Sequence, residues 1–200
     1  KELAERFNLP FDENIPIIGL ISRLFDSKGL DLVQKAFADL MKLDVQVVLL
    51  GTGDQKYHAL FDKMASKYPK KFASYLGFND ELAHLIEAGS DMFLMPSKYE
   101  PCGLNQMYSL AYGTVPIVRE TGGLADTVVK FNDQTEDGTG FVFKKYDAEE
   151  MIKEIKRAVK AFEDKKVWQK IMRAGMKLDF SWDVSAKRYI ELYKTILSSD

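Results

Sequence analysis

The fold is decided by a pattern that begins at Ile15-Pro-Ile-Ile-Gly-Leu-Ile21, an apolar run of strand length. A polar loop at residues 22–29 follows this run, and residues 30–42 then place apolar side chains at helical spacing. Strands that read as near-continuous apolar runs are typical of a sheet whose two faces are both covered. The stretch therefore predicts one strand–loop–helix unit of an α/β protein.

The same unit repeats along the chain. Further strands are predicted at residues 45–50, 72–76, 91–95, 114–118 and 140–143, and further helices at residues 54–67, 80–88, 104–112 and 123–130. This alternation predicts a doubly wound parallel sheet of the α/β class, Rossmann-like in its arrangement. We expect a single domain over residues 1–200 with its core at residues 14–146. An extra C-terminal helical segment, residues 147–200, follows it, with helices predicted at residues 147–163, 165–177 and 183–197.

Composition excludes several classes of protein. The 28 Lys and Arg residues against 30 Asp and Glu give a net charge of −2, which argues against a nucleic-acid binder because such proteins need a basic surface. One cysteine and two histidines are too few for a disulfide framework or a metal cluster built from these residues. No apolar run approaches the roughly 18 residues of a membrane span, and the first residues lack the apolar segment of a signal peptide. We therefore expect a cytoplasmic protein, or a fragment of one, without a membrane or nucleic-acid partner.

Ligands of doubly wound sheets bind beyond the carboxyl ends of the strands, so the loops at those ends carry the candidate site. In the loop at residues 22–29, Arg23 and Lys28 are two cations five residues apart. Such a pair suits a diphosphate, whose charge must be balanced as a bond to it breaks. From this loop alone, two solvated surface charges remain the alternative.

A second loop combines a carboxylate with a predicted helix start. Pro101 is typical of the first position of a helix. The three amides that follow are predicted to point out of the helix N-terminus and to bind an anion; they belong to Cys102, Gly103 and Leu104. Glu100 precedes them, where a carboxylate can accept hydrogen bonds from sugar hydroxyls. The alternative is that Glu100 only complements the helix dipole.

A third loop, Thr121-Gly122-Gly123, carries paired glycines that let backbone amides approach a phosphate closely, although a glycine pair before a helix is also an ordinary structural feature. Together the three loops supply two cations, two groups of amides and one carboxylate. That inventory fits a sugar bound through a diphosphate. The sequence has no Asp-x-Asp motif for a divalent metal, so we expect a metal-independent site without a cofactor, in which the cations balance the phosphate charge.

These loops also carry a family resemblance. The run from Pro96 to Val128, PSKYEPCGLNQMYSLAYGTVPIVRETGGLADTV, resembles the signature of bacterial glycogen synthases and plant starch synthases. Ser22-Arg-Leu24, Lys28-Gly-Leu-Asp31 and Phe180-Ser-Trp-Asp183 are similar as well. Members of this family have the GT-B fold, in which two Rossmann-like domains face a cleft. The chain resembles only the C-terminal half, and the N-terminal GT-B domain is expected to be missing from it.

The resemblance assigns roles to individual residues. Arg23 and Lys28 match the pair that holds the donor diphosphate, and Glu100 matches the acidic residue at the glucose hydroxyls near the reacting centre. Phe78 matches an aromatic residue, usually Tyr, that stacks on adenine. Two backbone segments complete the set: Cys102, Gly103 and Leu104 at the sugar and distal phosphate, and Thr121, Gly122 and Gly123 as a second phosphate loop.

The activity that the resemblance implies is that of a retaining hexosyltransferase. It would transfer glucose from ADP-glucose to the non-reducing end of an α-1,4-glucan. Related GT-B enzymes often have a second Glu eight residues after Glu100, where it holds the ribose. Here that position is Tyr108, which favours the glycogen and starch synthase branch and leaves the ribose contact unassigned. The fragment alone is expected to be inactive, and the location to be cytoplasmic, or plastidial in a plant.

Two alternatives remain open. One is the donor domain of another GT-B glycosyltransferase that uses a UDP-sugar, and the other is a free-standing nucleotide-sugar-binding module without catalysis.

The C-terminal end carries a further expectation. Trp182 is predicted to pack the final helix, and in the resembling family this helix crosses back to the N-terminal domain. Part of its apolar stripe is therefore expected to be exposed in an isolated half; the stripe consists of Tyr189, Leu192, Tyr193 and Ile196.

Overall fold

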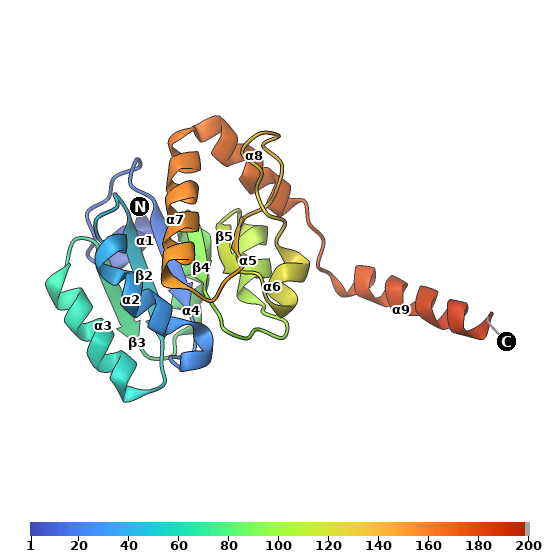
Figure 1. Ribbon diagram of the computed structural model, residues 1–200, viewed down its shortest axis with the longest axis horizontal. Helices are drawn as coiled ribbons and strands as arrows, with labels where there is room; N and C mark the ends of the chain where they lie inside the picture. Colours follow the sequence, from blue (N-terminus) through green and yellow to red (C-terminus); the bar gives the residue numbers. More distant parts are fainter. Residues whose placement is uncertain (199–200) are drawn as a thin grey trace.

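The computed structural model describes residues 1–198, and its centre is a six-stranded sheet with strand order β3-β2-β1-β4-β5-β6 (Figure 1). The strands are β1 (Ile17–Ile21), β2 (Gln46–Gly51), β3 (Phe72–Leu76), β4 (Met92–Met95), β5 (Val115–Arg119) and β6 (Phe141–Phe143). Neighbouring strands pair in parallel, and each strand begins and ends within two residues of its predicted bounds. The prediction of a doubly wound, Rossmann-like α/β sheet is confirmed.

The strand order reverses next to β1. The chain runs outward from β1 through β2 to β3, then returns to β4 on the other side of β1 and continues to β5 and β6. Strands β1 and β4 pair through Ile18 with Met92 and Gly19 with Phe93. The loops that leave the carboxyl ends of β1 and β4 therefore flank the position at which open α/β sheets bind ligands.

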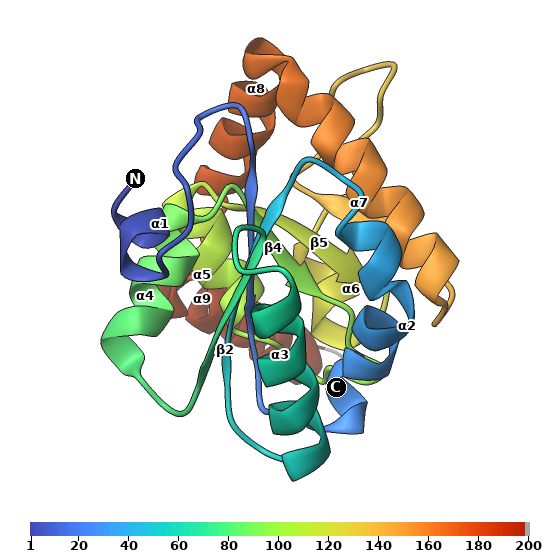
Figure 2. The same cartoon turned by 90° about the vertical axis from the view of Figure 1, so that its left-hand side faces the viewer.

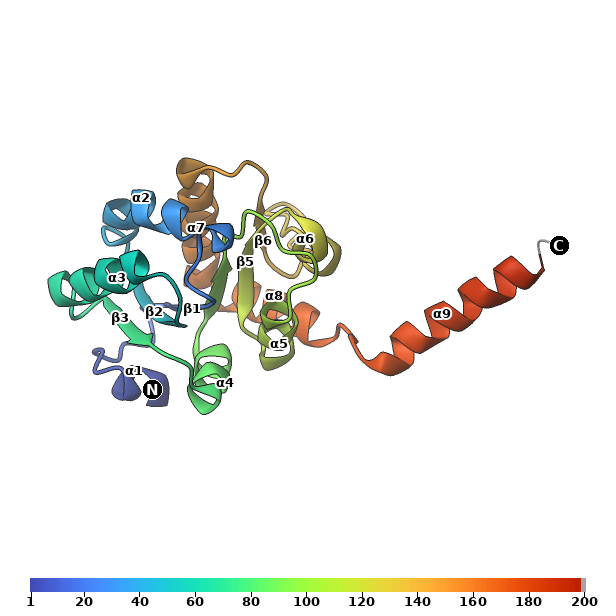
Figure 3. The same ribbon diagram turned by 90° about the horizontal axis from the view of Figure 1, so that it is seen from below.

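Alternate side chains of the strands are buried on opposite faces of the sheet, because the side-chain period of a strand is two. In β1, Ile18 and Leu20 belong to one hydrophobic cluster and Ile17 to the other. The first face is covered by α2 (Leu30–Leu40), α3 (Gln55–Lys67) and α7 (Ala148–Glu163), and the second by α1 (Glu2–Arg6), α4 (Asp80–Gly89), α5 (Asn105–Tyr112) and α6 (Gly122–Thr127). Figure 2 shows α1 and α4 on one side of the strands and α2 and α7 on the other, and Figure 3 shows the same layers from below.

Two more helices follow these layers. Helix α8 (Lys165–Met176) buries Trp168 and Ile171 in the first cluster, and the Trp168 ring stacks on Phe141 with 6.3 Å between ring centroids. Helix α9 (Trp182–Leu197) projects away from the sheet (Figure 1), and none of its side chains is buried. The extra C-terminal helices that the sequence predicts are therefore present.

The packing predicted for Trp182 is wrong, because its side chain is 85% exposed. Helix α9 leaves the body of the domain, so no face of a neighbouring helix covers the indole within the described residues. The exposure expected for the apolar stripe is confirmed, since Tyr189, Tyr193 and Ile196 are each 58% exposed.

Two local differences from the predicted elements have simple causes. Helix α1 was not predicted, because five residues cover little more than one helical turn and give no readable period. Helix α6 ends at Thr127, three residues before the predicted end. There the backbone of Val128 becomes extended, and Lys130 forms a parallel bridge with Gly140 beside β6.

Candidate active site

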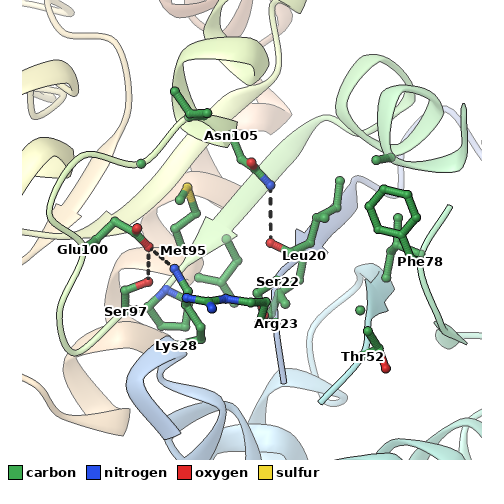
Figure 4. A pocket seen from close by; sticks show the side chains of 18 of the residues that line it. Leu20, Ser22, Arg23, Lys28, Thr52, Phe78, Met95, Ser97, Glu100 and Asn105 are labelled. Carbon is green, nitrogen blue, oxygen red and sulfur yellow. Dashed lines mark hydrogen bonds and ion pairs between the residues drawn. The ribbon is translucent and has the colours of Figure 1, made fainter. Parts of the chain in front are cut away.

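A pocket of about 310 Å³ opens at the carboxyl ends of β1, β2 and β4, at the switch point of the sheet (Figure 4). Six of the residues that the sequence singled out line it: Arg23, Lys28, Phe78, Glu100, Gly103 and Leu104. The pocket therefore joins both cations, the carboxylate and the aromatic ring, although they come from three separate loops.

Glu100 is a buried carboxylate that is fixed by two donors. The residue is only 7% exposed. Its Oε2 accepts hydrogen bonds from Lys28 Nζ at 2.6 Å and from Ser97 Oγ at 3.0 Å (Figure 4). A buried charge is tolerated only when it is paired and hydrogen-bonded. The Lys28 ammonium and the Ser97 hydroxyl therefore supply the partners that a carboxylate at the floor of the pocket requires.

Arg23 differs sharply from Lys28. Its side chain is exposed at the pocket, and its guanidinium carbon lies 5.9 Å from the centre of the Phe25 ring. Within residues 1–198, no carboxylate pairs with Arg23 and no hydrogen bond engages its guanidinium. Its five N–H donors are therefore available to an anion that enters the pocket.

A close backbone contact holds together the two loops at residues 22–29 and 96–104. Gly29 has a φ of +73°, and a Cβ at this position would lie 2.0 Å from the carbonyl oxygen of Pro96. Beside it, the backbone N–H of Lys98 donates to the carbonyl of Ser27 at 2.9 Å. Only glycine fits both the left-handed backbone and the close approach at position 29, so this residue allows the loops that carry Lys28 and Glu100 to lie against each other.

Phe78 lies at the rim of the pocket with its ring 85% exposed. The next residue, Asn79, caps α4 by accepting a hydrogen bond from the Leu82 N–H at 2.9 Å. This cap fixes the backbone at the residue that follows Phe78 and so helps to hold the Phe78 ring in place. An exposed ring held at the edge of a pocket offers an apolar face to a planar base.

Helix α5 begins at Asn105, one residue after the start of the helix predicted at residues 104–112. The helix start that Pro101 indicated is wrong, and the three candidate amides precede the helix. Gly103 has a φ of +73°, which interrupts a right-handed helix, and a Cβ there would lie 2.4 Å from Gln106 Oε1. Gln106 Nε2 in turn donates to the carbonyls of Cys102 and Gly103 at 3.1 and 3.0 Å. Gly103 and Leu104 line the pocket, whereas Cys102 lies outside it with an exposed thiol.

The glycine loop at Thr121, Gly122 and Gly123 does not line the pocket. The Gly123 N–H donates to the carbonyls of Glu100 and Pro101 at 3.1 and 3.2 Å, so this amide is engaged within the protein. A Cβ at Gly122 would lie 2.1 Å from the Glu100 carbonyl oxygen. The loop therefore supports the backbone of Glu100 from behind, and its role as a second phosphate loop stays a prediction.

Sequence reasoning missed three residues of this region. Ser97 donates to Glu100, Asn105 lines the pocket and donates to the Ile21 carbonyl at 3.4 Å, and Arg119 donates from Nε to the Ser97 carbonyl at 2.8 Å. A signal for Arg119 was available, because it is a cation at the carboxyl end of a strand, the criterion that selected Arg23. Ser97 had no signal of its own, since a serine in a loop is common.

Residues 1–198 contain no group of three or more His, Cys, Asp or Glu side chains arranged to hold a metal ion. Among the helices of the same residues, none combines the length and the apolar character that crossing a membrane requires.

Solved structures with a similar fold are glycosyltransferases. The catalytic domain of starch synthase IV from Arabidopsis thaliana, bound to ADP and acarbose, is 33% identical and superposes with a TM-score of 0.88 over 98% of this chain and 42% of that chain. Sucrose-phosphate synthase from Thermosynechococcus elongatus, 22% identical, matches all of this chain and 49% of that chain with a TM-score of 0.71, and shows the fold alone. The sheet of this chain therefore has the fold found in GT-B glycosyltransferase structures.

Curated relatives and a family model agree with this likeness. Glycogen synthases from Bacillus cereus (strain B4264) and Pseudothermotoga lettingae are 49% and 50% identical over 197 residues. These residues are 98% of this chain but only 41% and 40% of those proteins, so the chain spans about two fifths of the length of its relatives. The family model of the glycosyl transferases group 1 matches residues 1–174. With its Rossmann-like sheet and the pocket at the switch point, the chain belongs to the group 1 glycosyl transferases.

Proposed function

We propose that residues 1–200 are the single nucleotide-sugar-binding domain of a glycogen or starch synthase that uses ADP-glucose. The reaction is the transfer of glucose to the non-reducing end of an α-1,4-glucan with retention at the anomeric carbon. The observation that carries this proposal is the pocket at the switch point, because it combines two cations, a buried carboxylate and an exposed aromatic ring. The 49% identity to glycogen synthases supports it.

Arg23 and Lys28 bind the donor diphosphate. The Arg23 guanidinium makes no hydrogen bond or ion pair within residues 1–198, and Lys28 has three N–H donors of which one is directed to Glu100. Charge-assisted hydrogen bonds from these cations strengthen as the phosphate gains charge in the transition state. The two side chains take over the charge balance that a metal ion provides in other transferases, so the proposed site needs no metal and no cofactor.

Glu100 orients the glucosyl group by accepting hydrogen bonds from its hydroxyls. In the proposed step, the bond between the anomeric carbon and the phosphate oxygen breaks, and its electron pair leaves with ADP. The acceptor hydroxyl oxygen bonds to the anomeric carbon on the same face, and its proton passes to the leaving phosphate. The step therefore needs no carboxylate nucleophile from the protein.

Phe78 stacks on the adenine. The similar starch synthase IV structure is bound to ADP, which supports an adenine nucleotide over a uridine nucleotide for this chain. Backbone groups of Gly103 and Leu104 line the sugar end of the pocket. The ADP-sugar is therefore proposed to lie from Phe78 at the rim to Glu100 at the floor.

A second, N-terminal GT-B domain supplies the opposite wall of the cleft and holds the glucan acceptor. The relatives are more than twice as long as this chain, which leaves room for such a domain. Correct placement of two reactants contributes roughly 7–11 kcal/mol of barrier lowering, and half a cleft forfeits most of it. We propose a cytoplasmic location, or a plastidial one in a plant.

Incubation with labelled donor and glycogen tests the proposal. The protein that carries this chain is expected to incorporate label from ADP-glucose and little from UDP-glucose. Label from UDP-glucose alone would identify a different GT-B transferase, and label from neither donor would leave a binding module. The 200-residue chain alone is expected to bind ADP weakly in a thermal-shift assay and to transfer no glucose. Transfer near the rate of the longer protein would refute the need for a second domain.

A further inference from the structure

We infer that Arg119 is a positioning residue that fixes the Glu100 carboxylate in the pocket, an inference that rests on the proposed function. Arg119 ends β5 and reaches across to the loop that carries Glu100. Its Nε donates to the Ser97 carbonyl at 2.8 Å and its Nη2 donates to the Lys98 carbonyl at 2.5 Å. One guanidinium therefore clamps two consecutive carbonyls directly before the turn that presents Glu100.

The clamp acts on Glu100 through Ser97. The carbonyl of Ser97 accepts from Arg119, and the hydroxyl of the same residue donates to Glu100 Oε2 at 3.0 Å. Ser97 is itself buried, so its backbone and side chain move together. A shift of the Ser97 backbone would therefore carry the hydroxyl away from the carboxylate.

The clamp also reaches the opposite loop of the pocket. Lys98, whose carbonyl accepts from Arg119, donates its own N–H to the Ser27 carbonyl at 2.9 Å. Ser27 is the neighbour of Lys28, which pairs with Glu100 at 2.6 Å. Arg119 thus holds the backbone before Glu100 directly and is linked to the backbone before Lys28 through Lys98, although it touches neither side chain of the pair.

Arg119 is held in turn by a polar stack on the other side. Its guanidinium carbon lies 5.8 Å from the centre of the Tyr146 ring, and the Tyr146 hydroxyl donates to Asp31 Oδ1 on α2. Burial raises the pKa of Tyr146, so the phenol stays protonated and remains a donor. The planar fork of Arg fits two carbonyls at once, which a Lys ammonium does not reproduce.

The test compares three variants of the protein that carries this chain. Arg119→Ala removes the clamp, Arg119→Lys keeps the charge without the fork, and Lys144→Ala is the control. Lys144 is an exposed neighbouring cation whose ammonium pairs only with Glu120 within the described residues, at 3.6 Å. Its backbone carbonyl accepts from Arg119 Nη1 at 3.5 Å, and the substitution keeps this carbonyl. Because misplacement of a reacting group by about 1 Å can cost on the order of 100-fold in rate, Arg119→Ala should lower kcat by that order. The affinity of Arg119→Ala for ADP should stay within about twofold of wild type. The kcat of Arg119→Lys should lie between those of wild type and Arg119→Ala, and the kcat of Lys144→Ala should equal that of wild type.

Two further measurements separate positioning from simple loss of stability. In a Glu100→Gln background, Arg119→Ala should add little, because the carboxylate that it positions is already gone. Hydrogen exchange at residues 97–104 should be faster in Arg119→Ala than in Lys144→Ala, whether or not the protein transfers glucose. An unchanged kcat, an equal loss in the Glu100→Gln background, or unchanged exchange would overturn the role of Arg119. Failure of the wild-type protein to transfer glucose would overturn the proposed function instead, and the exchange measurement would still decide on Arg119.

Discussion

The two loops that flank the pocket, residues 22–29 after β1 and residues 96–104 after β4, share the Lys28–Glu100 ion pair, but Arg23 of the first loop and Glu100 of the second differ in how they are held. In the first loop Arg23 is exposed and unengaged within the described residues, whereas in the second Glu100 is buried and held by two donors. The Arg23 charge of the first loop is thus available to pair with a bound anion. The Glu100 carboxylate of the second loop is already held in position, as is usual for a group that acts on a reacting centre.

The backbones of the loops are anchored differently as well. The first loop is tied through Asp26, whose carboxylate accepts from Lys56 and Tyr57 at 2.5 and 2.6 Å. The second is tied through Ser97, next to Glu100 itself. We therefore expect substitutions in the second loop to act on the rate of transfer and substitutions at Arg23 to act on nucleotide affinity.

The largest effect is expected for Glu100→Gln. This change keeps the shape of the side chain and removes the charge, so transfer should fall on the order of 1,000-fold, as when a preorganised electrostatic group is lost. ADP affinity, measured by calorimetry, should be kept or improved because Lys28 is released from its ion pair. A loss of ADP affinity as large as the loss of rate would show that Glu100 serves the nucleotide rather than the sugar.

The contact between the loops should be almost as sensitive. Gly29→Ala adds a Cβ that would lie 2.0 Å from the Pro96 carbonyl oxygen at a φ of +73°, so the free energy of unfolding in urea should fall by about 3 kcal/mol. Gly77→Ala is the matched control. It also lies in a loop that lines the pocket, but its Cβ would meet only the Tyr75 ring, at 3.0 Å. Equal stability of the two variants would mean that the loops are not held together at Gly29.

A smaller effect is expected for Arg23→Ala. Removal of charge-assisted hydrogen bonds worth about 1.5–3 kcal/mol should weaken ADP binding roughly 10- to 100-fold and lower transfer. Stability should not change, because Arg23 makes no polar contact within residues 1–198. Arg188→Ala, on the projecting helix α9, controls for the loss of one positive charge. Wild-type ADP affinity in Arg23→Ala would remove Arg23 from the site and abolish the contrast between the loops.

The smallest effect is expected for Cys102→Ala. The thiol is exposed and outside the pocket, so stability and transfer should stay within about 0.5 kcal/mol of wild type. Gly103→Ala, one residue further, should be harmful because its Cβ would lie 2.4 Å from Gln106 Oε1. A large loss in Cys102→Ala would show that the thiol, and not only the backbone of this loop, takes part in the reaction.

The sheet and the place of the site could be predicted from the sequence. Strands that are buried on both faces appear in the sequence as apolar runs, and a polar loop after such a run marks the carboxyl end of the strand. For this reason Arg23, Lys28 and Glu100 could be singled out before any coordinates. The helix predicted at residues 104–112 matches α5 to within one residue. The helix start indicated by Pro101 is wrong, because the proline signal competes with the left-handed backbone of Gly103 and the side chain of Gln106.

The sequence by itself determined the order of strands and helices, the ligand-binding edge of the sheet and the residue types that meet there, because each is encoded in local periodicity and loop chemistry. Only the tertiary structure decided which groups are partners. Lys28 and Glu100 are 72 residues apart and Arg119 is 22 residues from Ser97. The two tryptophans show the same limit, since Trp168 is buried against Phe141 and Trp182 is exposed at the start of α9. A periodic pattern defines the apolar face of a helix, but burial depends on which atoms the fold brings against that face.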